Sequence, residues 1–407
     1  MKKILFISIL TIGMVVFAGC VESNNNNTSI QPNMDIPSNY SAPSISKYAE
    51  EMNLTYYDEN GNVVNPYNGD KWAYKLLIDS TGQKILLKNE SQKIPKWAEG
   101  KYDIVINVPL KNVVVMSSTQ IALMEAINDD NSVIGSVKGI MWGKSYKWYF
   151  KDINESLESG KIVDVGSTTN PNWDLILNIS PEVIFVYPGY GGDAIIEKSK
   201  ELGINYVADA EYNENSYLGR CEWVKMFAAF YNKEPEAKRY FGSIEKNVLE
   251  IQTKLKDVNE KPSVVWGYNS KWGCYVPRGD SYVVKGIELC GGNYVFKDLN
   301  GTGSEKIDYE VFAERARNAD IWVVPSSTEW LSDFKDNHPG YQTFKSVKND
   351  RVFCRSDDYY QMGLLHTDVV LMDLATILYP EEFKGRETHF FLKYNIENNS
   401  ATPFIAG

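Results

Sequence analysis

The distribution of apolar residues separates the start of the chain from the rest. Residues 1–20 carry two lysines directly after Met1, continue with an apolar run over 4–17 and end in Ala18-Gly19-Cys20. This pattern is typical of a secretory signal peptide, and the run is too short for a membrane-spanning helix. A cysteine directly after the small pair is the lipobox arrangement. We therefore expect a lipidated Cys20 that anchors an extracytoplasmic protein to the cell membrane; the alternative is a plain secreted protein.

Residues 21–47 form the next segment and contain few apolar positions. They hold an asparagine run at 24–27, several serines and three prolines. Such a composition cannot bury enough surface to offset the entropy of ordering. We expect a flexible tether between the lipid anchor and the folded body.

Residues 48–105 show short apolar runs separated by turn signals. Asn60-Gly61 is typical of a tight hairpin turn, and Ser80-Thr81-Gly82 separates two further runs. We interpret this segment as an N-terminal β extension.

From residue 106 the pattern changes to an alternation of buried strands and helices. Within 106–220 the expected strands are 112–118, 132–136, 182–188 and 204–209, and the expected helices are 119–128, 172–179 and 194–203. This alternation predicts a parallel sheet with helices on both faces. We interpret 106–220 as an N-terminal α/β lobe.

Residues 221–258 interrupt the alternation with two helical segments, 221–232 and 236–258. Pro235 is well placed in the first turn of the second helix. At about 1.5 Å per residue this helix would be roughly 35 Å long, which is enough to span a small domain. We expect a helical connector.

The alternation resumes over 259–395. The expected strands are 262–268, 320–325 and 351–355, and the expected helices are 281–291, 309–319 and 367–380. The predicted fold class is therefore α/β, with two Rossmann-like lobes built on central parallel sheets and joined by one long helix.

Composition narrows the possible partners. The formal net charge of −11 argues against nucleic acid, since phosphate binding needs a basic surface. Four cysteines remain beyond Cys20, without metal-ligand spacing, and we expect buried free thiols; one Cys274–Cys290 bridge is the alternative. The three histidines are not paired at metal-ligand spacing, so no metal site is expected.

The 26 tyrosines and 10 tryptophans favour an aromatic ligand cleft as well as a core. In an open parallel sheet, ligands bind beyond the carboxyl ends of the strands, and two lobes can share one such cleft. Rings would stack on a bulky, flat or anionic ligand, hydroxyls would orient it, and an arginine would bind its carboxylate or phosphate oxygens. The candidate ligand-binding residues at these strand ends are Ser118, Thr119, Trp142, Tyr187, Tyr190, Tyr268, Trp272, Tyr275, Arg278, Tyr282, Tyr359 and Tyr360.

Some of these candidates have a simpler interpretation. Ser118 and Thr119 are also ordinary N-caps for the following helix. Arg278 could pair with Asp280 instead of a ligand.

Direct metal ligation by Tyr359 and Tyr360 with His366 is possible, but half-exposed rings and a histidine at a helix start are the preferred interpretation. We also expect Arg220 to pair with Glu222 as a structural unit. Trp148 and Tyr149 are expected in packing or on a loop surface.

The order of these elements and their junctions resembles the helix-linked (class III) substrate-binding proteins of ABC importers. The resemblance covers about residues 100–390. It is carried by the motifs VPLKNVVVMSSTQIALMEAI, VGSTTNPNWDLILNISPEVIFVYP, LGRCEWVKMFAAFYNKEPEA, GCYVPRGDSYVV and LMDLATILYPEEF. It implies a binding function, without a resident cofactor, toward a ferric siderophore, haem or corrinoid.

The resemblance also implies a permease partner. Family members carry an acidic residue at the start of one helix in each lobe, which docks onto arginines of the permease. The corresponding positions are Asp174 and Glu310, and the aspartate departs from the usual glutamate. Acids in a first helical turn also complement the helix dipole.

We therefore expect a monomeric, membrane-tethered binding protein of an ABC importer that captures a small-molecule chelate or corrinoid. An extracytoplasmic enzyme or a surface sensor on the same scaffold is the alternative. No nucleophile elbow, zinc-protease motif or P-loop supports an enzyme.

Overall fold

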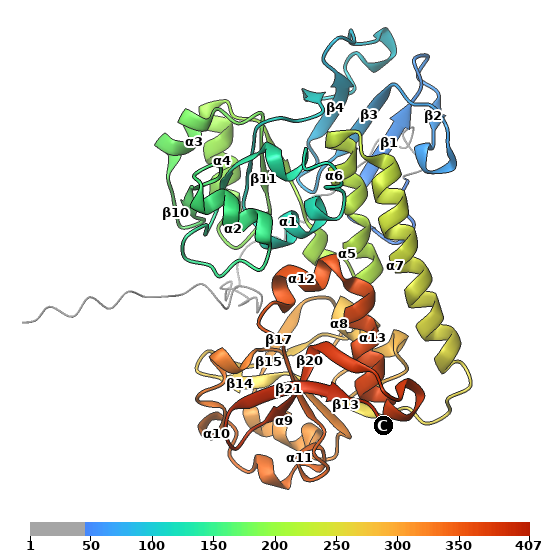
Figure 1. Cartoon of the computed structure of the whole chain (residues 1–407), viewed down its shortest axis with the longest axis vertical. Helices are drawn as coiled ribbons and strands as arrows, with labels where there is room; N and C mark the ends of the chain where they lie inside the picture. Colours follow the sequence, from blue (N-terminus) through green and yellow to red (C-terminus); the bar gives the residue numbers. More distant parts are fainter. Residues whose placement is uncertain (1–44) are drawn as a thin grey trace, which may run out of the picture.

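The computed structural model describes residues 45–407 (Figure 1). The predicted signal peptide, Cys20 and residues 21–44 of the predicted tether lie outside the described residues. Two α/β lobes lie one above the other in Figure 1, and the long helix α7 (Glu234–Leu255) runs beside both. The predicted fold class is confirmed.

An N-terminal sheet precedes the first lobe. Its strands are β1 (Asn53–Tyr57), β2 (Val63–Val64), β3 (Tyr74–Ile78), β4 (Lys84–Asn89) and β5 (Ile104–Val108), in the order β2-β1-β3-β4-β5. The turn between β3 and β4 covers an edge strand of the first lobe, because Asp79 accepts from the backbone N–H of Ala208 at 3.0 Å. The Gln83 side chain donates to the Tyr206 carbonyl at 3.0 Å. An edge that would otherwise be open to pairing is thereby protected.

One buried ion pair attaches this sheet to the connector. Lys75 on β3 lies 2.7 Å from Glu234 at the start of α7, and both side chains are almost fully buried. The Lys75 ammonium also donates to the side chain of Asn232 at 2.8 Å and lies 3.9 Å from the ring centre of Trp72. Burial lowers the pKa of Lys75 to about 8, against the opposing effect of Glu234.

The N-lobe contains a five-stranded parallel sheet in the order β12-β11-β6-β7-β8. Every residue of β6, β11 and β12 is buried, as expected for a sheet covered on both faces. The strands are β6 (Val113–Val115), β7 (Val137–Ile140), β8 (Val163–Asp164), β11 (Val183–Val186) and β12 (Tyr206–Ala208), with a small β9 (Gly166–Ser167) and β10 (Asn170–Pro171) hairpin. The helices are α1 (Ser118–Glu125), α2 (Lys151–Glu158), α3 (Trp173–Ile179) and α4 (Gly192–Leu202).

The strand predicted at 132–136 is wrong, because the strand in this region lies directly after these residues. The segment ends in a 3-10 turn, Ile134–Ser136, and the strand β7 follows it. The side chain of Asn128 accepts from the Ile134 backbone N–H at 3.0 Å and holds the turn. Such a local side-chain bond competes with strand pairing.

The connector consists of α5 (Tyr217–Glu222), α6 (Val224–Tyr231) and α7. The single helix expected at 221–232 is broken at Trp223, whose indole N–H donates to Glu214 at 2.7 Å. All residues of α6 are buried. The buried residues of α7 recur every three or four positions, so one face of the helix packs on the body.

The C-lobe sheet has the order β16-β13-β18-β19-β20-β21. Its parallel strands are β13 (Ser263–Trp266), β16 (Asn293–Tyr294), β18 (Ile321–Val324) and β19 (Val352–Arg355), followed by the antiparallel β20 (Glu387–Asn395) and β21 (Ser400–Ile405). A second sheet contains β14 (Tyr268–Ser270), β15 (Gly273–Pro277) and β17 (Ser304–Ile307). The helices are α8 (Tyr282–Leu289), α9 (Tyr309–Ala316), α10 (Phe334–Asn337), α11 (Lys345–Lys348), α12 (Tyr359–Leu365) and α13 (Thr367–Leu378).

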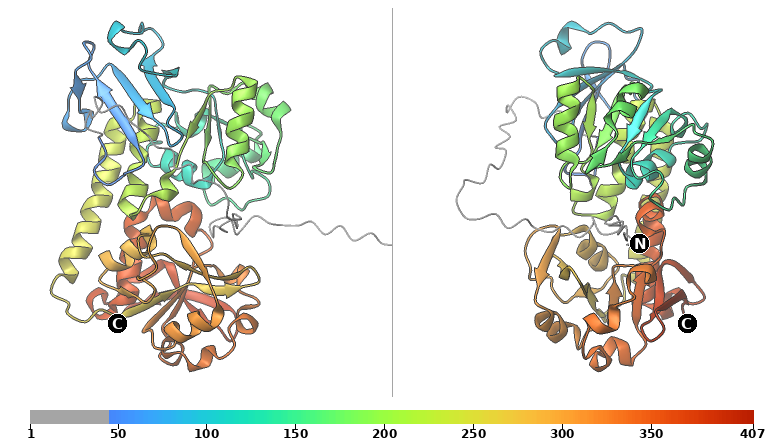
Figure 2. Two further views of the ribbon diagram at one scale, coloured as in Figure 1. Left: turned by 180° about the vertical axis from the view of Figure 1, so that it is seen from behind. Right: turned by 90° about the vertical axis from the view of Figure 1, so that its left-hand side faces the viewer.

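The two lobes also touch directly. Helix α1 of the N-lobe packs against α12 of the C-lobe. On α12, the buried amide of Gln361 donates to the carbonyl of Lys147 at 2.6 Å and accepts from the N–H of Tyr149 at 2.8 Å. The rear view in Figure 2 shows the connector helices on one side of this contact. The lobes are therefore held together by both the connector and a polar bridge.

No single helix between residues 45 and 407 is long and apolar enough to cross a membrane. The consecutive helices α12 and α13 reach that length and composition only together, and they meet at a bend of 105°. Helix α13 packs against α7 and β20 within the body.

The four cysteines after Cys20 are buried free thiols, as predicted. Cys274 and Cys290 are not bridged. Burial raises the pKa of Cys274 to about 12, so its thiol stays protonated and unreactive near neutral pH.

Candidate ligand-binding site

A cavity of about 320 Å³ lies between the two lobes. It is lined from the N-lobe by residues such as Ser118, from the connector by Tyr217 and from the C-lobe by Tyr282. Small-molecule sites in proteins typically measure roughly 300–1,000 Å³ and are mostly apolar with a few placed polar groups. The size and position of this cavity suit the binding of one small ligand.

The N-lobe wall is built at the carboxyl ends of β6, β7 and β11. Ser117 caps α1 by accepting from the Thr119 N–H at 3.1 Å, which turns Ser118 and Thr119 toward the cavity lining. The cap is thus Ser117, one residue before the predicted pair. Trp142 follows β7 with a left-handed backbone (φ 64°) and also lines the cavity.

Tyr187 and Tyr190 follow β11 and complete the N-lobe wall. The loop needs glycine at position 192, because a Cβ there would lie 1.7 Å from the Tyr187 carbonyl oxygen. Tyr212 stands edge-on to both rings, at 6.5 Å and 6.0 Å between ring centres. Tyr190 is 43 % exposed, so this aromatic group extends to the cavity mouth.

The connector contributes a charged group to the cavity. Arg220 donates to Glu211 at 2.7 Å, and both side chains are largely buried. The predicted Arg220–Glu222 pair is wrong, because Glu222 instead pairs with Lys225 at 2.5 Å. The Arg220 guanidinium also lies 4.3 Å from the ring centre of Tyr282 in the C-lobe. The ion pair therefore contacts both lobes.

The C-lobe wall is formed by Tyr282 at the start of α8 and by Tyr359 and Tyr360 at the start of α12. Tyr359 shares a hydrogen bond with Tyr217 at 3.0 Å, and Tyr360 accepts from Arg355 at 2.5 Å. His366 is exposed and does not line the cavity. The three side chains considered for metal ligation are therefore not gathered at one point.

Four of the predicted residues lie outside the cavity lining: Tyr268, Trp272, Tyr275 and Arg278. They belong to β14, to the turn between β14 and β15, to β15 and to the loop after β15. Antiparallel pairing of β15 with β17 places Arg278 beside Glu305, with which it forms an ion pair. Arg278 therefore pairs with Glu305 and not with Asp280, and its contact with a ligand stays a prediction. Trp272 is 49 % exposed at the β14–β15 turn.

Several residues that line the cavity were not predicted. Arg355 is the last residue of β19, so the strand-end rule could have identified it. Trp148 was expected in packing or on a loop surface; it is buried and also lines the cavity. Asp209 directly follows β12, so the same rule could have identified it. Tyr212 in the loop before the connector, and Tyr217 and Arg220 on α5, have no evident signal in the sequence.

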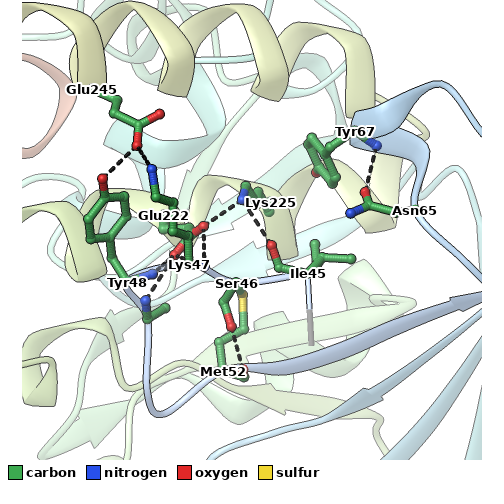
Figure 3. Close-up of polar contacts among 11 residues, drawn as sticks. Ile45, Ser46, Lys47, Tyr48, Met52, Asn65, Tyr67, Glu222, Lys225 and Glu245 are labelled. Carbon is green, nitrogen blue, oxygen red and sulfur yellow. Dashed lines mark hydrogen bonds and ion pairs between the residues drawn. The ribbon is translucent and has the colours of Figure 1, made fainter. Parts of the chain in front are cut away.

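Residues 47–51 are fixed beside the cavity by two buried carboxylates, Glu222 and Glu214, and Figure 3 shows the contacts of Glu222. Glu222 accepts from the backbone N–H groups of Lys47, Tyr48 and Ala49 at 2.6–2.9 Å. Glu214, which also lines the cavity, accepts from the next two N–H groups, at 2.8 and 3.1 Å. Residues 45–47 therefore belong to the folded body rather than to the flexible tether.

Residues 45–407 contain no group of three or more histidine, cysteine, aspartate or glutamate side chains arranged to hold a metal ion. The donors that line the cavity include hydroxyls, indoles, the side-chain amides of Gln120 and Asn213, and two guanidinium groups. Three carboxylates also line it: Asp209, Glu211 and Glu214. The donor groups can bind the oxygens and rings of a ligand.

Asp209 gives the cavity a titratable group. Burial, followed by the nearby charge of Glu211, raises the pKa of the Asp209 carboxyl. Between the unfolded and folded pKa values, the native state holds a proton that the unfolded state has lost, so stability falls as pH rises through this window.

Asp209→Asn should remove this loss of folding stability at high pH, because asparagine does not titrate. We expect the variant to gain on the order of 1–3 kcal/mol at pH 8, because one pKa unit corresponds to about 1.4 kcal/mol, and less at pH 4. Thermal unfolding of both proteins across this pH range measures the difference. Equal shifts at both pH values would contradict the assignment.

The two predicted docking residues lie on different lobes. Asp174 is in the first turn of α3 and Glu310 is in the first turn of α9, and both are exposed. Each has an exposed aliphatic neighbour, Leu177 and Val311 respectively. Docking on a permease stays a prediction.

The two lobes, the helical connector and the cavity between them define a binding protein of the two-lobed class. A family model described as periplasmic binding protein matches residues 113–359, and the chain belongs to this family. Family and structural neighbours are binding proteins rather than enzymes.

Similar proteins fall into two groups. The chain is 68 % identical to an uncharacterized lipoprotein of Methanocaldococcus jannaschii, over the full length of both. A solved possible iron-binding (periplasmic solute-binding) protein from Staphylococcus epidermidis has a TM-score of 0.53 at 17 % identity, covering 67 % of this chain and 99 % of that one. The periplasmic vitamin B12 binding protein of Vibrio cholerae has a TM-score of 0.50 at 13 % identity, covering 66 % and 97 %.

Proposed function

We propose that this chain is a membrane-tethered substrate-binding protein of an ABC importer. It captures an iron chelate, such as a siderophore or haem, or a corrinoid in the cavity between its lobes and delivers it to the permease. The observation that carries the proposal is the cavity itself, which both lobes and the connector enclose with aromatic and hydroxyl side chains.

The chemistry of the cavity supports a ligand with flat or apolar faces and polar edges. Trp142, Tyr187 and Tyr282 offer ring faces from opposite lobes. Arg220 and Arg355 offer donors to oxygen atoms. Solved proteins of similar fold are named for binding iron or vitamin B12, which fits ligands of this kind.

Delivery of the ligand to the permease would depend on the lipid anchor at Cys20 and on the exposed acids Asp174 and Glu310. A lipid at Cys20 would keep the protein near its permease, and such tethering raises the effective concentration of the second binding event. The M. jannaschii relative is named a lipoprotein, which supports the anchor. Asp174 and Glu310 would engage the two halves of the permease, one from each lobe.

A binding panel tests the proposal. The purified folded body, residues 45–407, is titrated by calorimetry and tryptophan fluorescence with ferric hydroxamate and ferric citrate chelates, haemin, cobinamide and cyanocobalamin. We expect saturable binding of at least one of these at one ligand per chain. Clear binding of an unrelated solute, with none of these bound, would contradict the chelate assignment.

A further inference from the structure

Arg355 occupies an unusual position in the cavity. It ends β19 in the C-lobe, is 2 % exposed and lines the cavity wall. Its guanidinium is surrounded by rings, at 4.2 Å from the centre of Tyr359, 5.0 Å from Tyr360 and 5.3 Å from Trp266. A buried cation in such a position needs compensation for its lost hydration.

No carboxylate among the described residues pairs with Arg355 to offset the cost of burying its charge. Its hydrogen bonds go to the Tyr360 hydroxyl at 2.5 Å and, at 3.5 Å, to the Pro325 carbonyl. Its Nε atom is buried and has no partner in the described chain. Arg220, the other cavity arginine, is neutralised by Glu211 at 2.7 Å. One cavity arginine thus has its counter-ion and the other does not.

Three further donors in the same cavity are unpartnered within residues 45–407. The side-chain amide N–H of Gln120, the indole N–H of Trp148 and the hydroxyl of Ser281 are buried without a hydrogen-bond partner. Buried donors are nearly always satisfied in native proteins, so each such group calls for an acceptor. Together with Arg355 these make four groups, and the residues that supply them line the cavity from the N-lobe and the C-lobe.

We infer that Arg355 is the anion-receiving group of the cavity, and that the physiological ligand carries an oxyanion, a carboxylate or a phosphate, which supplies the missing counter-ion. The inference rests on the proposed function, because it takes the cavity as the ligand site. Charge-assisted bonds between guanidinium and oxyanion are short and about twice as strong as neutral ones. Tyr360 and the surrounding rings fix the guanidinium, and the ring faces stay available to the rest of the ligand.

The test uses simple oxyanions as probes, so that it does not depend on identifying the ligand. Residues 45–407 of the wild type, Arg355→Lys, Arg355→Gln and Arg315→Gln are titrated with citrate and with inorganic phosphate at constant ionic strength. Arg315→Gln is the matched control, because this C-lobe arginine pairs with Asp298 on the surface, outside the cavity. Tryptophan fluorescence reports binding, since Trp266 lies beside Arg355, and thermal unfolding reports the integrity of each variant.

We expect saturable binding of citrate, phosphate or both by the wild type and by Arg315→Gln. Arg355→Gln should weaken it by about 30- to 100-fold, the equivalent of losing a desolvated charge-assisted contact. Arg355→Lys should retain the charge but lose the fork geometry, for a loss of about tenfold. The relative response to citrate and phosphate distinguishes a carboxylate from a phosphate ligand.

Unchanged anion affinity in a folded Arg355→Gln, or in Arg355→Lys if the first variant does not fold, would overturn the inference. Absence of a saturable response of the wild type to both anions would also overturn it. The proposed function fails by a different result, the lack of binding to every chelate and corrinoid in the panel. Binding of a neutral chelate that is independent of Arg355 would leave the function standing and remove the inference.

Discussion

Replacing Glu222 with alanine is expected to reduce the free energy of unfolding by about 3–5 kcal/mol, because it breaks a fully buried ion pair and leaves Lys225 without its partner. The change also removes the acceptor for three consecutive backbone N–H groups, those of Lys47, Tyr48 and Ala49. Each buried donor left unsatisfied adds about 1–3 kcal/mol of cost where water cannot reach it. Denaturant unfolding of residues 45–407 measures the loss.

Glu245→Ala is the matched control for this prediction. Glu245 accepts from the hydroxyl of Tyr48 at 2.5 Å and pairs with Lys47 in the same segment, but its side chain is 32 % exposed. A partly exposed pair of this kind contributes about 0.2–1 kcal/mol. A similar loss in both variants, or a loss below 1 kcal/mol for Glu222→Ala, would show that the segment is not held by the buried carboxylate.

Lys75→Met is expected to cost about 3–5 kcal/mol as well. It leaves the Glu234 carboxylate buried without its partner and removes the contact between the ammonium and Trp72. The N-terminal sheet should loosen from α7, so hydrogen exchange in residues 53–89 should accelerate more than in the C-lobe. Denaturant unfolding and hydrogen exchange measure these two effects.

The double variant Lys75→Met with Glu234→Gln separates the charge effect from packing. Because no uncompensated charge remains, it should lose less stability than Lys75→Met alone. Lys198→Ala, which breaks an exposed pair with Glu201, serves as the surface control and should change stability by less than about 1 kcal/mol. Additive losses in the double variant would contradict a buried ion pair between β3 and α7.

Much of the fold could be predicted from local sequence. The buried runs at 113–115 and 183–186 are strands, and the residues that follow them, Ser118 and Tyr187, line the cavity. The reason is that strand ends in a parallel sheet share one edge whatever the rest of the chain does. Helix α7 was predictable because its apolar residues repeat at helical spacing over 22 residues.

The remaining site residues depend on long-range pairing that the sequence does not encode locally. Arg278 follows β15 and Arg355 ends β19, so their places in the sequence are alike. Only the folded structure shows that the pairing of β15 with β17 brings Glu305 to Arg278, whereas Arg355 has no acid as a partner among the described residues. In the same way, Glu222 pairs with Lys225, three residues later, and not with its neighbour Arg220. It also accepts hydrogen bonds from backbone N–H groups such as that of Lys47, 175 residues earlier in the chain.

The central claim, that the cavity between the lobes is the binding site, is tested most directly by filling it. Ser118→Trp places a large ring on the N-lobe wall, on α1 and away from the buried ion pairs. Any chelate or corrinoid bound by the wild type at one per chain should lose at least 100-fold in affinity in this variant, while thermal unfolding stays close to that of the wild type. Undiminished binding at one per chain by the folded Ser118→Trp protein would place the site elsewhere and contradict the account.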